Sequence, residues 1–379
     1  MAATDPASRI AGWQIQEGRH TLPWQDTRDP YRIWLSEIML QQTQASTVIS
    51  YYQRFLELFP DVLALANAPA DAVMHAWAGL GYYARARHLH RCAQQVRDHH
   101  QGRFPKDAQT LETLPGIGRS TAAAIAAFSD GQRQPILDGN VRRVLIRYLA
   151  LEGDPASAAM TRTLWAHAQA WLDQAPESLD MRAYTQGQMD LGATVCTRHQ
   201  PACTRCPLQE DCTARKQGLQ NTLPRPRNRR EVPRHECWMP VIECENHLWL
   251  QRRPAGGVWG SLWALPVCEH PSEADILLAH LGVSAKDRQN LAAFEHIFTH
   301  FRLRIRPLWL PAREPLQIVK AAATWPEICT TPSARQSKNP VLIPPEAGTH
   351  AWVPIAGLSG LGMPAPISRL LLGLYPGTD

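Results

Sequence analysis

The sequence lacks a long apolar run. No stretch of about eighteen consecutive apolar residues occurs in it, and its start, MAATDPASRIAGW, has no apolar core of the kind found in secretion signals. Internal repeats and low-complexity tracts are absent as well. These absences argue against a secreted or membrane-spanning protein and against a repeat array, and we expect a soluble intracellular protein.

Composition and length indicate a globular protein with two domains. Apolar residues make up 44% of the 379 residues, which excludes general disorder. A chain of this length exceeds what one hydrophobic core usually organises. The formal net charge of +5 is a mild basic excess, which permits a polyanionic partner without requiring one.

Four cysteines lie close together in the sequence: Cys196, Cys203, Cys206 and Cys212. In a protein without a secretion signal, thiols at this density indicate a metal centre rather than disulfides. Structural zinc usually binds two short Cys-x2–4-Cys pairs, and only Cys203 and Cys206 have that spacing. Unequal gaps within one loop suit an iron–sulfur cluster better. The spacing favours iron–sulfur and leaves zinc open.

A second motif, Leu114-Pro115-Gly116-Ile117-Gly118, separates two segments with helical patterns, 108–113 and 120–127. Proline ends the first helix, and the glycines permit a sharp turn. The amides at the start of the second helix then point outward and can bind a phosphate without reading a base. This is the helix-hairpin-helix pattern of non-specific DNA binding, and the alternative is an ordinary turn between helices.

The pattern of the sequence changes near residue 213. Residues 1–212 read as mainly helical, with the cysteine loop at 196–212 at their end. Residues 213–234 are basic and proline-containing, and we interpret them as an extended linker. Strand-like alternation dominates residues 235–379, together with two helical patches, near 275–281 and 367–374. The pattern of residues 235–379 predicts a small α+β domain.

Taken together, these motifs resemble the endonuclease III superfamily of DNA base-excision glycosylases, and within it the MutY-type adenine glycosylases. The resemblance is carried by the hairpin, the cysteine loop and four further segments. These are Pro23-Trp24, Leu35-Ser36-Glu37-Ile38-Met39-Leu40-Gln41-Gln42-Thr43-Gln44, Gly79-Leu80-Gly81-Tyr82-Tyr83-Ala84-Arg85 and Leu137-Asp138-Gly139-Asn140-Val141. It implies a six-helix barrel module packed on a helical module that carries a 4Fe–4S cluster, held by the four cysteines. It further implies a monomer bound to double-stranded DNA in a bacterial-type cytoplasm, in association with the nucleoid.

Two acids are the candidate catalytic pair. Release of adenine requires a proton for the departing base and negative charge near the developing sugar cation. Glu37 lies in an apolar helical context that should raise its pKa, whereas Asp138 at a helix start should stay ionised. The resemblance matches both positions and adds Asn140 as a residue that holds the site. Each acid taken alone is more simply a solvated helix acid or an N-cap.

Ser120 distinguishes the branches of the superfamily. Relatives that also cut the strand carry at this helix start a lysine that forms a Schiff base with the sugar, and a serine cannot form that imine. We therefore expect a monofunctional glycosylase, with Ser120 capping its helix. The alternatives are a bifunctional glycosylase/lyase for oxidised pyrimidines and a non-catalytic DNA-binding repair scaffold.

Further DNA contacts are implied by the resemblance. Gln42 and Tyr82 would enter the duplex, Gln186 occupies a position that contacts the target base, and Arg198 would contact a phosphate. The hairpin would contribute Leu114, Gly116, Gly118 and Ser120.

The C-terminal residues resemble the Nudix-like domain of MutY proteins. No helix with the clustered glutamates that bind magnesium in Nudix hydrolases is found in the sequence, so this domain should recognise rather than hydrolyse. By resemblance, Phe298, Thr299 and His300 occupy the turn that inspects 8-oxoguanine, with threonine where the family has serine. The expected function is removal of adenine mispaired with 8-oxoguanine or guanine.

Overall fold

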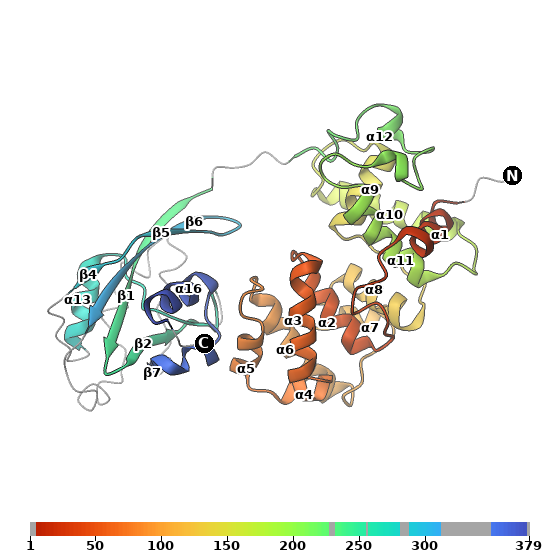
Figure 1. Cartoon of the computed structure of the whole chain (residues 1–379). Helices are drawn as coiled ribbons and strands as arrows, with labels where there is room; N and C mark the ends of the chain where they lie inside the picture. Colours follow the sequence, from red (N-terminus) through yellow and green to blue (C-terminus); the bar gives the residue numbers. More distant parts are fainter. Residues whose placement is uncertain (1–4, 227–231, 255–256, 281–287, 312–349, 377–379) are drawn as a thin grey trace. The chain divides into compact units, whose positions relative to one another are not determined.

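The computed structural model describes residues 5–226, 232–254, 257–280, 288–311 and 350–376 (Figure 1). The chain divides into two compact units. The first comprises Met1–Asn67 and His88–Asn228, and the second comprises Ala68–Arg87 and Arg229–Asp379. No helix in the described ranges has the length and apolar character needed to cross a membrane.

The first unit is helical, as predicted. Its elements are α1 (Pro6–Glu17), α2 (Pro30–Leu40), α3 (Ala45–Leu58), α4 (Val62–Asn67), most of α6 (Ala84–His99), α7 (Ala108–Glu112), α8 (Arg119–Asp130), α9 (Gly139–Leu149), α10 (Ala158–Gln174), α11 (Met181–Asp190), a π-helical turn (Leu191–Val195), a 3₁₀ turn (Cys203–Arg205) and α12 (Thr213–Lys216).

Aspartate caps fix where several of these helices begin. The side chains of Asp29, Asp107, Asp138 and Asp180 each accept a hydrogen bond from a backbone N–H of the first turn of α2, α7, α9 and α11. Such bonds satisfy amides that have no partner within the helix. Two of these caps, Asp138 and Asp180, lie beside the candidate site described below, so the same residues that start helices also place polar groups there.

One apolar core holds α1, α8, α9, α10 and α11 together. It contains Ile10 of α1, Ala127 of α8, Leu145 of α9, Trp171 of α10 and Tyr184 of α11. Close packing at these points leaves the helices little freedom to shift. The loops between them are therefore held firmly enough to position side chains.

The second unit combines one short helix from the N-terminal part with a mixed sheet. Its elements are α5 (Ala70–Ala76), β1 (Arg234–Cys244), β2 (His247–Arg252), β3 (Trp263–Ala264), α13 (Pro271–His280), β4 (Gln289–Asn290), β5 (Phe294–Ile297), β6 (Arg302–Pro311), β7 (His350–Pro354), a 3₁₀ turn (Ile355–Gly360) and α16 (Ala365–Leu374).

Among the described residues, the sheet has the order β3-β2-β1-β6-β4, with β5 paired to β6 and β7 paired to β2. The pair β1 and β6 is parallel, from Arg234 opposite Arg302 to Glu243 opposite Pro311, and the other pairs are antiparallel. Helix α13 packs on the sheet through Ala274 and Leu277. The predicted α+β class of this part is confirmed.

Asp71, in the first turn of α5, forms an ion pair with Arg252 (2.6 Å). One local prediction differs from the structure. Residues 213–216 of the predicted extended linker form α12. Part of that linker, 227–231, and Leu281 of the predicted helical patch lie outside the described residues.

Candidate active site

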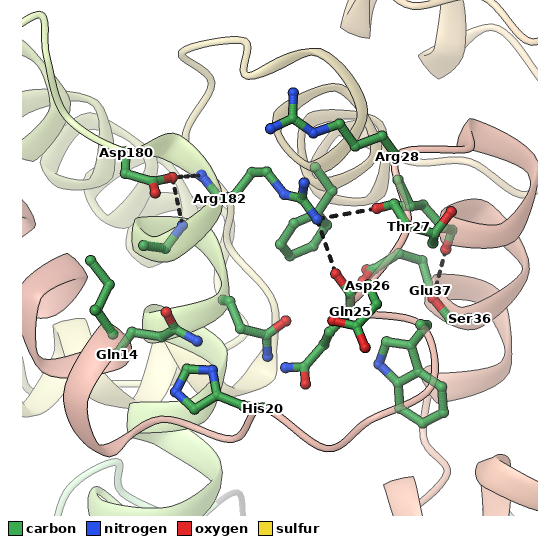
Figure 2. A pocket seen from close by; sticks show the side chains of 16 residues that line it. Gln14, His20, Gln25, Asp26, Thr27, Arg28, Ser36, Glu37, Asp180 and Arg182 are labelled. Carbon is green, nitrogen blue, oxygen red and sulfur yellow. Dashed lines mark hydrogen bonds between the residues drawn. The ribbon is translucent and has the colours of Figure 1, made fainter.

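A pocket of about 370 Å³ opens in the first unit (Figure 2). Its walls come from the end of α1, the segment between α1 and α2, the middle of α2, the end of α8 and the start of α11. The lining residues are Gln14, Ile15, His20, Trp24, Gln25, Asp26, Thr27, Arg28, Ile33, Ser36, Glu37, Phe128, Asp180, Arg182, Ala183 and Gln186. Polar groups thus converge on a cavity of the size that holds a small planar molecule.

Glu37 lies on the pocket wall formed by α2. The rest of this helix packs inward through fully or nearly fully buried residues such as Trp34 and Ile38. Burial, and then the negative charge of Asp138, raise the pKa of Glu37 to about 8. Removing a carboxylate from water disfavours the charged form, so the Glu37 carboxyl holds its proton at neutral pH.

Asp138 is the N-cap of α9. Its Oδ1 accepts the N–H of Val141 (2.8 Å) and its Oδ2 accepts Nδ2 of Asn140 (3.2 Å). Burial raises the pKa of Asp138, and these hydrogen bonds and the charge of Arg143 oppose that rise. From its place at a helix start alone, Asp138 was expected to stay ionised. In the structure, burial has a larger effect on its pKa than the hydrogen bonds of the cap. The negative charge of Asp138 in turn contributes to the raised pKa of Glu37, so the two carboxyls are electrostatically coupled.

Asn140 is fixed from two further sides. Arg143 Nη2 donates to Asn140 Oδ1 (2.8 Å), and the same guanidinium donates through Nε to the carbonyl of Cys196 (2.7 Å). A Cβ added to Gly192 in the π-helical turn would lie 2.5 Å from the Asn140 Cβ, so only glycine fits at this position. The backbone of the cysteine loop and the amide beside Asp138 are therefore joined through one arginine.

Ser120 does not cap its helix. The N-cap of α8 is Gly118, and Ser120 Oγ instead accepts the N–H of Leu137 (2.9 Å). The sequence prediction of a capping role was wrong because the partner lies in the next segment of the chain. Ser120 thus holds the residue directly before Asp138.

The hairpin between α7 and α8 has the predicted form. Gly116 has a φ of +79°, and a Cβ there would lie 2.8 Å from the His88 Cβ, so both backbone conformation and space require glycine. No side chain caps α8 at Gly118. Leu114 is buried, so the contact predicted for it can involve only its backbone.

The four cysteines line one small cavity, together with Arg147 and Arg215. As they stand, no three His, Cys, Asp or Glu side chains in the described part of the chain meet closely enough to hold a metal ion. The prediction that these four thiols hold a 4Fe–4S cluster therefore stays a prediction. Arg198, predicted to contact phosphate, is exposed in the same loop.

Arg147 is buried beneath this loop. It donates to the carbonyls of Thr197 (2.6 Å), Arg198 (3.0 Å) and Leu223 (2.8 Å) and contacts Cys196 Sγ (3.3 Å). One guanidinium thereby satisfies several backbone acceptors and connects the cysteine loop to the segment that follows α12.

Comparisons with known proteins agree with this arrangement. Residues 35–169 match the HhH-GPD superfamily base excision DNA repair protein family, and residues 237–373 match the NUDIX domain. The adenine DNA glycosylase of Buchnera aphidicola subsp. Acyrthosiphon pisum (strain APS) is 34% identical over 299 residues, which cover 79% of this chain and 84% of that protein. The chain belongs to the adenine DNA glycosylase family. The Homo sapiens adenine DNA glycosylase is 33% identical over 381 residues, covering 83% of this chain and 69% of that protein.

A solved structure shares the fold of the helical part. The thermostable thymine-DNA glycosylase is 27% identical with a TM-score of 0.50, and the match covers 56% of this chain and 95% of that one. The helix-hairpin-helix fold predicted for the N-terminal part is thus shown, as is the Nudix-like character of the C-terminal part of this family member.

Gln42 and Tyr82 both have backbone conformations that are rare outside glycine. Gln42, in the first unit, is exposed with a φ of +58°, and Tyr82, in the second, has a φ of +49° and a side chain 47% exposed. The turn before Tyr82 is held by Trp77 Nε1 and Arg85 Nη2, which donate to the carbonyl of Gly81. Strained turns that present exposed side chains are common at functional sites.

Tyr82 meets the predicted lesion-recognition turn within the second unit. Its hydroxyl lies 3.4 Å from Thr299 Oγ1. Thr299 and His300 are exposed, whereas Phe298 stacks on Phe301 with ring centroids 4.3 Å apart. The turn therefore offers a hydroxyl and an imidazole outward, and Phe298 supports it from within.

The sequence alone did not indicate several polar residues of the pocket, among them His20, Arg28, Asp180 and Arg182. Arg182 Nη2 donates to the carbonyls of Gln25 (3.0 Å) and Thr27 (3.1 Å), as Figure 2 shows. These contacts join segments far apart in the sequence. The only local signal was the cap at Asp180, which marks a helix start but not a pocket.

We predict that Arg147→Met lowers the free energy of unfolding by about 3 kcal/mol or more, because buried carbonyls lose their donor. Urea denaturation measures the change. Arg198→Ala is the matched control, since its exposed side chain has no such role, and it should change the free energy by less than about 0.5 kcal/mol. Equal effects of the two substitutions would contradict the role of Arg147.

Proposed function

We propose that the protein is a monofunctional DNA glycosylase of base-excision repair that releases adenine opposite 8-oxoguanine or guanine. The family relationship supports adenine as the base removed. The observation that carries the proposal is a carboxyl group, Glu37, with a pKa of about 8 in a pocket that accommodates a purine, electrostatically coupled to Asp138.

The two acids divide the reaction between them. Glu37 gives its proton to a ring nitrogen of the base while the N-glycosidic bond breaks and its electrons leave with the base. Asp138, whose anionic form is favoured by the hydrogen bonds from Val141 and Asn140 and by the charge of Arg143, stabilises the positive charge that develops on the sugar. Water then adds to the sugar carbon, and its proton returns the site to its starting state. Asn140 holds Asp138 in place through its Nδ2.

Ser120 supports base release without strand cleavage. An imine with the sugar needs an amine, and Ser120 offers only a hydroxyl, which already accepts the N–H of Leu137. Without an amine to form an imine, this site is left with hydrolysis of the N-glycosidic bond.

Binding of duplex DNA is assigned to three features. The amides at the start of α8 next to Gly116 and Gly118 suit a phosphate, because no side chain caps that end. Arg198 adds positive charge. Gln42 and Tyr82, exposed on strained turns, would enter the duplex and repay the few kcal/mol needed to flip a base out.

Recognition of 8-oxoguanine is assigned to the second unit. The hydroxyls of Tyr82 and Thr299 lie 3.4 Å apart on exposed positions, so a ring stacked on Tyr82 would have the Thr299 hydroxyl and the His300 imidazole within reach. These groups can bond to the additional oxygen and N–H that distinguish 8-oxoguanine from guanine.

The four cysteines are proposed to hold a 4Fe–4S cluster. They line one cavity, and their unequal spacing within one loop suits a multinuclear cluster better than a single zinc ion. Such a cluster would fix the fold of the loop that carries Arg198 and whose carbonyl at Cys196 binds Arg143.

Glu37→Gln keeps the size of the side chain but removes the proton. We expect the rate of adenine release in a single-turnover assay to fall by about 100-fold or more, while binding of the mismatched duplex persists. Glu57→Gln, on the exposed side of α3, is the control. Undiminished release by Glu37→Gln would reject Glu37 as the acid.

The pH dependence follows from the same group. Glu37 acts in its protonated form, so the single-turnover rate should be lost as pH rises through about 8, by about tenfold per pH unit beyond it. A rate that stays constant well above that pH would show that the proton comes from elsewhere.

Thr299→Val removes a hydroxyl while keeping the shape. The ratio of rates for adenine opposite 8-oxoguanine and opposite guanine should fall by about two- to tenfold, the value of one neutral hydrogen bond. Thr299→Ser, which keeps the hydroxyl, should retain the ratio. An unchanged ratio in the valine variant would remove Thr299 from recognition.

Purified protein should contain about four iron atoms per chain. Cys203→Ala should lose this iron, and Cys92→Ala, at a buried thiol in α6, should keep it. Stoichiometric zinc in place of iron would contradict the cluster.

A further inference from the structure

A buried ion pair lies directly behind the pocket. The side chain of Asp190, at the end of α11, has no exposed surface, and Arg19 Nη2 approaches its Oδ1 to 2.6 Å. Arg19 Nε also donates to Oδ1 (2.7 Å), and the backbone N–H of Arg19 donates to Oδ2 (2.9 Å). A carboxylate held in this way by a guanidinium only accepts hydrogen bonds.

Gln186 contacts this pair from the pocket side. It lies one helical turn before Asp190 on α11, and its Nε2 donates to Asp190 Oδ1 (2.9 Å). The two ends of a glutamine amide are hard to tell apart by shape alone, but an acceptor-only partner settles the orientation. The NH₂ group must face Asp190, so Oε1 is the end available to the pocket that Gln186 lines.

Gln25, another glutamine near Arg19, has a different set of hydrogen bonds. Gln25 Nε2 donates to the carbonyl of Arg19 (2.8 Å), and Gln25 Oε1 accepts the N–H of Leu22 (3.1 Å). Both ends of that amide brace their own loop. Gln186 is therefore the pocket glutamine whose amide is oriented by a carboxylate, and no described residue donates to its oxygen.

We propose that Asp190, neutralised by Arg19, is a positioning residue that locks the Gln186 amide with its oxygen toward the pocket and so selects a base with an amino group at that edge. This inference rests on the proposed function. Adenine carries an exocyclic amino group, hypoxanthine carries an oxygen in its place, and purine carries hydrogen.

The lock matters because a free glutamine could serve either base. Rotation of its amide by half a turn would present NH₂ and accept hypoxanthine as readily as adenine. With the amide fixed, hypoxanthine places oxygen against oxygen, and purine leaves the Gln186 oxygen without a partner. Discrimination of this kind comes from a polar group that the wrong ligand cannot satisfy.

Asp190→Asn tests the lock with almost no change of volume. Oδ1 of Asp190 accepts from Arg19 and Gln186, and Oδ2 accepts the N–H of Arg19, so the asparagine must place an NH₂ against one of these donors. Loss of the negative charge also weakens the hydrogen bond that orients the Gln186 amide. Single-turnover release would be measured for adenine, purine and hypoxanthine at one position of one duplex. We expect the adenine-to-hypoxanthine and adenine-to-purine ratios to fall by about three- to tenfold.

A double-mutant cycle separates positioning from general damage. Gln186→Met removes the amide, and in that background Asp190→Asn should leave the ratios unchanged. If Asp190 were only a structural residue, its substitution would slow the release of all three bases equally, and unchanged ratios would overturn the inference. A further change of the ratios in the Gln186→Met background would overturn it as well.

The test also distinguishes this inference from the function on which it rests. Failure of the native protein to release adenine from any mismatch would reject both. Release by the native protein with unaltered ratios in Asp190→Asn would reject the lock alone.

Discussion

The burial of the Glu37 carboxyl within range of the charge on Asp138 is the constraint on which the site depends. In water both groups would be anions at neutral pH. Removal from water raises the pKa of both groups. For Glu37 the charge of Asp138 adds to the effect and the pKa reaches about 8, whereas hydrogen bonds from Val141 and Asn140 oppose the rise for Asp138. The fold supplies this difference by packing α2 against α8 and by starting α9 at Asp138.

The groups around the two acids hold them in place rather than react. Ser120 fixes the backbone before Asp138, Arg143 and Gly192 confine Asn140, and Arg182 ties the Gln25–Thr27 segment to α11. Apart from the contact between Arg143 and Asn140, these contacts join residues that are distant in sequence. A site built in this way needs little rearrangement when a base enters, which suits chemistry that depends on the placement of charge.

The sequence predicts much of the fold and the chemical centre of the site. The hairpin motif predicts α7 and α8, Asp138 marks the start of α9, and the apolar surroundings of Glu37 indicate its raised pKa. Ser120 was misjudged because its acceptor oxygen serves Leu137 and not its own helix. The orientation of Gln186, and the approach of Arg182 to a loop far away in the chain, depend on packing that no local pattern encodes.

The π-helical turn at Leu191–Val195 connects the helix that bears Gln186 to Cys196. Successive residues of an α-helix are rotated by about 100°. The wider π-helical turn changes this rotation, so that Gln186 faces the pocket while the segment that begins at Cys196 faces the cysteine cavity. Loss or gain of a single residue there would turn one of the two away from its target. Natural variation in this stretch is therefore expected to exchange side chains and to preserve its length.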